Sequence, residues 1–180
     1  MILKKLQFLI SYYILYRMNS VKYLRSLGAK IGQNCDIITH VKNFGSEPWL
    51  IEIGDSITIT QGVVFITHDG SSRLFRKRYP EMSRFGNRFG TIKINSNSFI
   101  GVNSIIMPGV EIGPDSIVGT GSIVTKTVPP NTVVAGNPAK MICSLEEYIK
   151  RYQAKMITIR STNRDDLRKE LTEIFWGKNR

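Results

Sequence analysis

The two histidines are the residues of this chain best suited to proton transfer at neutral pH. His68 lies in the stretch "FITHDG", directly before Asp69, and His40 lies in an earlier segment. An imidazole ring can exchange a proton near neutral pH, and it is also a common metal ligand. His68 therefore has three open interpretations: a catalytic residue, a metal ligand, or a polar residue at the end of a strand.

The chain offers few partners for a metal site. Catalytic zinc sites use three protein ligands, whereas the sequence contains only two histidines and no carboxylate cluster that obviously replaces a third. Cys35 and Cys143 are far apart and match no metal-ligand spacing. We therefore expect no metal, and we interpret the cysteines as free thiols in a reducing compartment.

His68 follows a segment with a six-residue repeat. Branched aliphatic residues recur at every sixth position, small or medium residues follow four positions later, and glycine often comes directly after the aliphatic. The clearest run is Ile94, Ile100, Ile106, Ile112, Val118 and Val124, and the same spacing recurs upstream in Ile53, Ile59 and Phe65 and in Ile31 and Ile37. A period of six matches neither an amphipathic helix nor a single alternating strand.

Short strands of a solenoid explain this period. Each hexapeptide forms one side of a coil, and three of them make a turn of about eighteen residues. The aliphatic residues then point into a narrow core, while glycine and small residues occupy the corners. Adjacent turns pair as parallel strands roughly 4.8 Å apart. The sequence thus predicts an all-β solenoid over residues 28–142.

Two breaks in the repeat predict insertions. The 22 residues from Ile31 to Ile53 are one turn of about eighteen plus four, which predicts a corner bulge within residues 43–50. After Phe65 the phase resumes only at Ile94, so residues 71–93 form an inserted loop that begins just after His68. A loop of this length in a regular fold favours a functional role.

The positive charge is concentrated in two segments. The net charge is +11, and residues 1–30 carry six Lys/Arg without an acid, while residues 71–90 carry six against Glu81 alone. Such surfaces attract an anionic ligand, a membrane or nucleic acid. The apolar stretch near the N-terminus is too short to span a bilayer, and no signal-peptide cleavage site follows it. We expect residues 1–27 to form an amphipathic helical segment that packs on the protein, with peripheral membrane contact as the alternative.

The residues after the repeat predict helices. "SLEEYIKRYQAK" begins with Ser144 as a helix cap and Glu147 three residues later, which is a capping box. "NRDDLRKELTEIFWG" places apolar residues along one helical face. We expect the extension 143–180 to cap or clasp the solenoid, and it carries no recognisable chemistry.

The passage "IGVNSIIMPGVEIGPDSIVGTGSIVTKTVPPNTVVAGNPAK", residues 100–140, resembles the C-terminal coils of maltose and galactoside O-acetyltransferases. It resembles still more closely the O-acetyltransferases of bacterial capsule, O-antigen and exopolysaccharide pathways. This resemblance to the hexapeptide-repeat acyltransferase superfamily covers residues 28–140. It implies a left-handed parallel β-helix; the handedness comes from the resemblance, since general chirality rules favour the opposite hand.

The resemblance also implies a role for His68. In this family a histidine at the root of a protruding loop acts as general base, and "THDG" matches the capsule-type members. A neutral imidazole can take the proton of a sugar hydroxyl while it attacks the thioester of acetyl-CoA. Transfer would be direct, without an acyl-enzyme, and backbone N–H groups near a coil corner would stabilise the oxyanion. Asp69 would orient the imidazole, bind the acceptor or form a turn.

Further acceptor contacts are expected from residues near the two insertions. Trp49 could stack on a sugar or simply pack, and Phe99 falls where galactoside-type enzymes place an aromatic residue. Arg88 belongs to the basic segment, whose arginines could meet a phosphorylated or nucleotide-linked sugar, a uronic-acid polymer or CoA. We interpret His40 as structural or peripheral.

The acetyl-CoA site implied by the resemblance lies in a groove between neighbouring columns, against the late coils. Carried onto this sequence, its contacts are Val102, Thr120, Gly121, Thr125, Lys126, Asn137, Pro138, Ala139 and Lys140. Either lysine could pair with a CoA phosphate as a point charge. Solvent exposure is the alternative for both.

Together these residues predict an acetyl-CoA-dependent O-acetyltransferase that acts on a saccharide hydroxyl in surface polysaccharide biosynthesis. We place it in the cytoplasm or at the inner face of the membrane. The resemblance implies a homotrimer with active sites between subunits. The alternatives are N-acetylation of a nucleotide-linked amino sugar, xenobiotic acetylation and a non-enzymatic basic scaffold. Zinc hydratases of the γ-carbonic anhydrase type share the fold, but this sequence lacks the three histidine ligands that their zinc ion needs. We expect no nucleic-acid partner.

Overall fold

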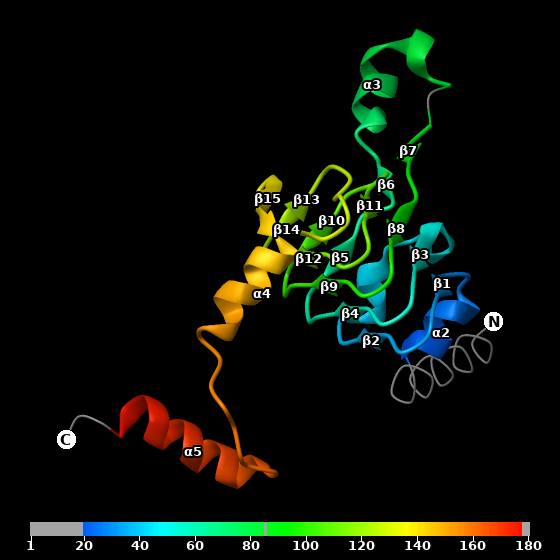
Figure 1. Cartoon of the computed structure of the whole chain (residues 1–180). Coiled ribbons are helices and arrows are strands. Elements are labelled where there is room, and N and C mark those ends of the chain that lie inside the picture. The colour runs from blue at the N-terminus through cyan, green and yellow to red at the C-terminus, as the bar shows by residue number, and fades with distance from the viewer. Residues whose placement is uncertain (1–19, 85, 178–180) are drawn as a thin grey trace, which may run out of the picture. The chain divides into compact units, whose positions relative to one another are not determined.

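The computed structural model describes residues 20–84 and 86–177, which form two compact units divided between Tyr148 and Ile149 (Figure 1). Most of the predicted N-terminal segment, residues 1–19, lies outside the described residues. The described part of this segment forms helix α2 (Ser20–Ser26). Among the described residues, no helix combines the length and the apolar character needed to cross a membrane.

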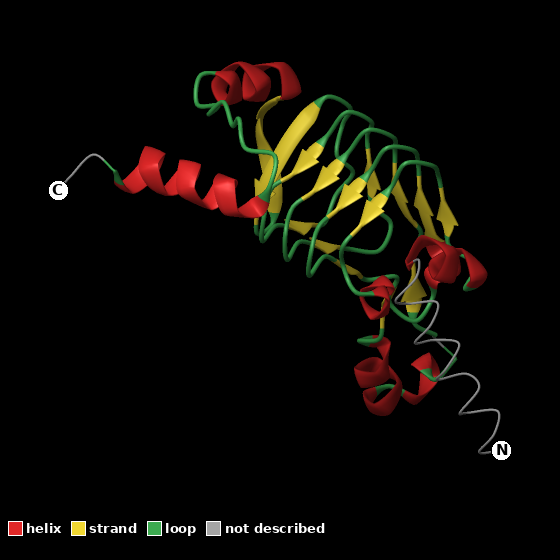
Figure 2. Cartoon of the chain, turned by 90° about the horizontal axis from the view of Figure 1, so that it is seen from below, coloured by secondary structure: helices red, strands yellow, loops and turns green. Residues whose placement is uncertain are grey.

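The first unit is a parallel β-helix with three faces, whose coils are stacked in Figure 2. Sheet A contains β1 (Lys30–Ile31), β3 (Ile51–Ile53), β8 (Ile92–Ile94) and β11 (Glu111–Ile112). Sheet B contains β2 (Asp36–Ile37), β4 (Thr58–Ile59), β9 (Phe99–Ile100), β12 (Ile117–Val118), β14 (Thr132–Gly136) and β15 (Ala139–Ser144). Sheet C contains β5 (Val64–Phe65), β10 (Ile105–Ile106) and β13 (Ile123–Val124).

The aliphatic residues of the repeat form the core of this unit. Strands of successive coils pair in register, so that Ile100 lies beside Ile59 on one side and Val118 on the other. All three side chains are fully buried. Because every coil adds its aliphatic residue at the same register, the stack buries one continuous column, as the repeat predicts.

The corners use two kinds of residue for two reasons. Glycine directly after the aliphatic residue is required by close packing: a Cβ on Gly101 would lie 2.5 Å from the backbone nitrogen of Thr120 in the next coil. The left-handed corner conformation is instead often taken by asparagine or aspartate, as at Asn97 and Asp115. Their short polar side chains tolerate a positive φ.

Both insertions reach the corner between sheet C and sheet A. In the first coil, the 3-10 turn η1 (Val41–Phe44) takes the place of a sheet C strand next to β5, and η2 (Pro48–Leu50) leads into β3. In the next coil, the chain leaves β5 to form an arm, residues 68–89, before it re-enters sheet A. The two breaks in the repeat therefore lie at the same corner of consecutive coils.

The arm contains strands and helices, whereas the sequence predicted a loop over residues 71–93. Strands β6 (His68–Asp69) and β7 (Arg88–Phe89) pair antiparallel, and α3 (Ser72–Arg78) and η3 (Pro80–Met82) follow β6 (Figure 1). The return to sheet A comes earlier than residue 94, because β8 begins at Ile92. Ile92 and Ile94 both point inward, as do Ile51 and Ile53 in β3, so the six-residue phase marks only one of two buried positions.

The C-terminal part contains the predicted helices and one strand that was not predicted. The expected last strand over 133–135 is β14, which pairs with β12 and then forms a hairpin with β15. The capping box is confirmed, since the N–H groups of Ser144 and Glu147 each donate to the other's side chain at 3.2 Å, where α4 (Leu145–Gln153) begins. In the second unit, α5 (Arg164–Trp176) is capped by Asn163.

Candidate active site

His68 is the first residue of the arm, and its side chain is 33% exposed. Its Nδ1 lies 2.9 Å from Oε2 of Glu47, a residue of the first insertion. An ionised carboxylate only accepts hydrogen bonds, so the neutral ring donates from Nδ1. This tautomer leaves Nε2 with a free lone pair, which is the form that a general base requires.

The surroundings of Glu47 keep its carboxylate ionised. Its Oε2 also accepts a 2.6 Å hydrogen bond from the hydroxyl of Thr67, and the side chain is only 14% exposed. The Thr67 hydrogen bond is the main cause that lowers the pKa of Glu47, and burial acts in the opposite direction. The hydrogen bond of His68 also lowers this pKa, as does the charge of His68 when its ring is protonated. The site thus contains a fixed negative charge beside the imidazole.

The first insertion places Glu47 through its packing. Phe44 and Phe65 are both fully buried, and their ring centroids lie 4.6 Å apart. Gly45 then turns the chain with a φ of 71°, close to Thr67. Pro48 opens η2 directly after Glu47 and fixes the backbone there. The four extra residues of the first break therefore support the carboxylate that contacts His68.

Asp69 takes part in a turn, which is one of the three roles expected for it. Its Oδ1 accepts the N–H of Ser71 at 2.8 Å, at the start of α3. This hydrogen bond is the main cause that lowers the pKa of Asp69, and the charge of Arg88 contributes less. The residue that contacts the imidazole is Glu47, which the sequence reading missed. The signal was available, because Glu47 is the only acid in the bulge 43–50.

Phe89 is a second residue that the sequence reading missed. It lies opposite His68 in the β6–β7 pair, and its exposed ring is centred 5.5 Å from the imidazole. Arg88 precedes it and lies opposite Asp69. An exposed aromatic ring beside the candidate base offers an apolar wall for an acceptor.

The other predicted acceptor contacts lie elsewhere on the β-helix. Trp49 is exposed on η2 and lines a pocket of about 150 Å³ with Lys30 and Lys93 of sheet A. Phe99 is exposed on sheet B, a different face from the one that leads to His68. His40 caps η1 by accepting the N–H of Lys42, which agrees with its structural interpretation.

The predicted cofactor contacts fall into two groups on the late coils. Val102, Thr120 and Gly121 lie at corners between sheets B and C, where the N–H of Gly121 donates to the carbonyl of Val102 at 2.8 Å. The second group lines a pocket of about 350 Å³ between the end of β13 and the β14–β15 hairpin: Thr125, Lys126, Pro138, Ala139 and Lys140. Asn137 lies in the same hairpin connection.

Sheet C lies between these two groups. Its outward side chains Val64, Ile105 and Ile123 are half-buried and stand in register. An apolar strip thus connects the corner at Gly121 with the pocket at Lys126. Within the described residues, no three potential metal ligands gather at this strip or at any other place.

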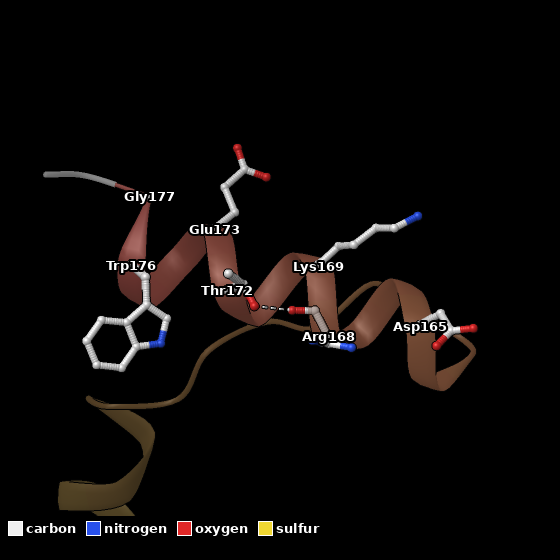
Figure 3. A pocket seen from close by; sticks show the side chains of 7 residues that line it. All are labelled: Asp165, Arg168, Lys169, Thr172, Glu173, Trp176 and Gly177. Atoms are coloured by element: carbon white, nitrogen blue, oxygen red, sulfur yellow. Dashed lines mark hydrogen bonds between the residues drawn. The ribbon is translucent and has the colours of Figure 1, made fainter. Parts of the chain in front are cut away.

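A larger hollow lies along one side of α5, with Arg168, Thr172 and Trp176 among its lining residues (Figure 3). It contains none of the predicted site residues.

Comparison with known proteins identifies relatives of the β-helix. Residues 91–126 match the family model described as the hexapeptide repeat of succinyl-transferase. Protein CapG of Staphylococcus aureus is 49% identical over 126 residues, which are 69% of this chain and 71% of CapG. Galactoside O-acetyltransferase of Escherichia coli K12 is 34% identical over 116 residues, which are 64% of this chain and 55% of that protein.

The solved structures agree. A hexapeptide-repeat-containing acetyltransferase from Vibrio cholerae O1 biovar eltor, complexed with acetyl coenzyme A, superposes with a TM-score of 0.54 at 26% identity. The match covers 71% of this chain and 79% of that one. The left-handed parallel β-helix expected from the sequence is confirmed. The chain belongs to the hexapeptide-repeat acetyltransferase family.

Proposed function

We propose that this acetyltransferase moves the acetyl group of acetyl-CoA to a saccharide hydroxyl in surface polysaccharide biosynthesis, with His68 as general base. The observation that carries the proposal is the 2.9 Å contact between His68 Nδ1 and Glu47 Oε2 at the root of the arm. It orients a half-exposed imidazole and leaves Nε2 free for the acceptor.

The reaction follows from this geometry. His68 Nε2 takes the proton of the acceptor hydroxyl as the hydroxyl oxygen attacks the thioester carbonyl carbon. Glu47 stabilises the imidazolium that forms, and backbone N–H groups at a coil corner stabilise the oxyanion. Collapse of the tetrahedral intermediate breaks the C–S bond, and the imidazolium returns the proton to the CoA sulfur. No acyl-enzyme is needed, because the thioester is already activated.

The late coils supply the place for the donor. The apolar strip of Val64, Ile105 and Ile123 suits the pantetheine arm, and it ends at the pocket that contains Lys126 and Lys140. Two ammonium groups there suit the phosphates at the nucleotide end of CoA. The Vibrio relative with bound acetyl coenzyme A supports the choice of donor.

We propose that three chains form a ring and share the sites. A heterologous interface that closes at three builds identical sites from unlike surfaces. This arrangement gives a role to Phe99, which is exposed on sheet B and would wall the site of the neighbouring subunit. Because acetyl-CoA is a cytoplasmic metabolite, we place the reaction in the cytoplasm. Contact of residues 1–19 with a membrane falls outside the described residues.

An acceptor screen tests the proposed reaction. CoA release from acetyl-CoA would be followed against oligosaccharides, free amino sugars and sugar nucleotides, and the product would be mapped by NMR. We expect turnover with an oligosaccharide and an ester at a ring hydroxyl. An amide product from an amino sugar would replace O-acetylation with N-acetylation, and turnover confined to xenobiotic amines would overturn the saccharide acceptor.

A further inference from the structure

The tip of the arm presents an exposed, basic and partly apolar surface that the transfer reaction does not use. We define the arm tip as residues 73–79. It contains four cations, Arg73, Arg76, Lys77 and Arg78, and no acid. We propose that the arm tip docks on a bilayer surface containing anionic lipids.

The first observation is the division of side chains on α3. At about 100° per residue, Arg73, Arg76 and Lys77 gather on one side of the helix, while Leu74 and Phe75 lie on the other side with Arg78 between them. Leu74 is 67% exposed and Phe75 is 42% exposed. A short helix that surrounds two exposed apolar side chains with cations suits the boundary between headgroups and acyl chains, where the aliphatic stem of an arginine can lie among apolar groups. Tyr79, also exposed, ends the helix with an aromatic residue of the kind enriched at membrane interfaces.

The second observation is the absence of internal partners for the charge. Within the described residues, none of Arg73, Arg76 and Lys77 takes part in a salt bridge. Arg78 lies over the ring of its neighbour Tyr79, at 5.8 Å from the ring centroid. The tip therefore keeps its positive charge for an external partner, and an anionic surface is complementary to it.

The third observation is that the helix is held at the tip of a defined stem. Ser72, the first residue of α3, is buried and donates to Asn87, which precedes the return strand β7. Figures 1 and 2 both show α3 projecting from the β-helix. Leu74 and Phe75 thus stay exposed because the stem holds the helix clear of the core.

Another kind of occupant suits this surface less well. A polyanionic chain such as nucleic acid would satisfy the cations but gives no reason for an exposed aliphatic Leu74. Anionic lipid satisfies both the cations and the apolar residues. Because the arm starts at His68, docking would also bring the proposed base close to a membrane-bound acceptor.

Co-sedimentation of the full chain with vesicles tests this proposal without any substrate. The vesicles would be phosphatidylcholine alone or with about 30% phosphatidylglycerol, at roughly 0.1 M salt. We expect binding to the anionic vesicles only. The triple variant Arg73→Gln, Arg76→Gln, Lys77→Gln should bind about a hundredfold more weakly, since each cation contributes about fivefold. The double variant Leu74→Ser, Phe75→Ser should lose about tenfold or more.

The matched control is the triple variant Arg151→Gln, Lys155→Gln, Arg164→Gln, which removes the same charge from exposed positions outside the arm. It should bind like the wild type. All variants retain residues 1–19, so differences in vesicle binding are due to the substituted residues. An unchanged melting temperature shows that the β-helix is still folded.

Three results would overturn the proposal. They are no binding of the wild type to anionic vesicles, equal losses in the two triple variants, and unchanged binding of the Leu74→Ser, Phe75→Ser variant. The last result would mean that charge alone is recognised, as expected for a soluble polyanion.

Discussion

The early and late coils of this β-helix have the same repeat but differ in what interrupts it. From Ile92 to Val124 the coils continue without an insertion, and each aliphatic residue stands above the one before. In the two coils that contain β1 and β5, both insertions reach one corner and bring Glu47 to His68. The regular coils provide the scaffold and the proposed donor surface, whereas the proposed chemistry arises where the repeat is broken.

The first way to test this contrast is to remove the base at the broken corner. His68→Ala should lower kcat by roughly 10²–10⁴, the usual contribution of a general base, and leave the fold intact. Steady-state acetyl-CoA turnover and thermal unfolding measure the two effects. His40→Ala is the matched control, because it removes the other histidine, which caps η1. This variant should retain near wild-type turnover.

A substitution in the regular coils should act on stability. Ile112 is fully buried and pairs with Ile94, so Ile112→Ala should lower the free energy of unfolding by about 2–5 kcal/mol. Its exposed neighbour on β11, Glu111, contacts Lys93 at 3.8 Å, and Glu111→Ala should cost less than about 1 kcal/mol. Denaturant unfolding compares the two variants. Similar costs for both would contradict a core made of the repeat aliphatics.

Glu47→Ala should have an intermediate effect on catalysis. A hydrogen bond to a charged group contributes about 1.5–3 kcal/mol, which corresponds to roughly a ten- to hundredfold loss in kcat. Glu47→Gln keeps an acceptor for Nδ1 without the charge and should recover part of the loss. If the Gln variant were no better than the Ala variant, a role of Glu47 in holding the imidazole would be ruled out.

Substitutions at the late-coil pocket should change donor binding without changing kcat. Lys126→Ala or Lys140→Ala would remove the proposed, partly hydrated ion pair with a CoA phosphate and should raise the KM for acetyl-CoA up to about fivefold. Lys93→Ala, an exposed lysine on sheet A, is the control. Acetyl-dephospho-CoA lacks the 3′-phosphate. With this donor, the increase in KM should be smaller for whichever of the two lysines binds the 3′-phosphate. Equal effects of the pocket and control lysines would argue against a CoA site at this pocket.

The smallest effect is a pH dependence of stability at the Glu47 corner. The pKa of Glu47 is lowered in the folded protein, chiefly by Thr67, so its ionisation favours the folded state. That contribution is fully present above the pKa of the unfolded chain, about 4.3, and is lost as the pH falls through the lower, folded value. Thr67→Val should raise the pKa of Glu47 in the folded protein and so narrow the pH range over which its ionisation stabilises the fold. NMR titration of the Glu47 carboxyl measures it, and an unchanged pKa would contradict the assigned cause.

The repeat could be predicted because it depends on local pattern. The six-residue phase identifies the aliphatic column at the core, although in β3 and β8 it marks only one of two buried positions. Glu47 stands out in the sequence as the only acid of the bulge 43–50, but its contact with His68 could not be predicted, because it depends on the stacking of Phe44 on Phe65 and on the turn at Gly45. The pairing of His68 with Phe89 across the arm likewise depends on contacts between residues far apart in the sequence.

The contrast between the two regions depends most on whether Glu47 acts through His68. A double-mutant cycle measures this directly by comparing kcat for the wild type, Glu47→Ala, His68→Ala and the double variant. We predict that Glu47→Ala costs roughly ten- to a hundredfold in the wild type and almost nothing when His68 is already alanine. The same cost in both backgrounds would show that the two residues act independently, and it would contradict the proposed role of the corner.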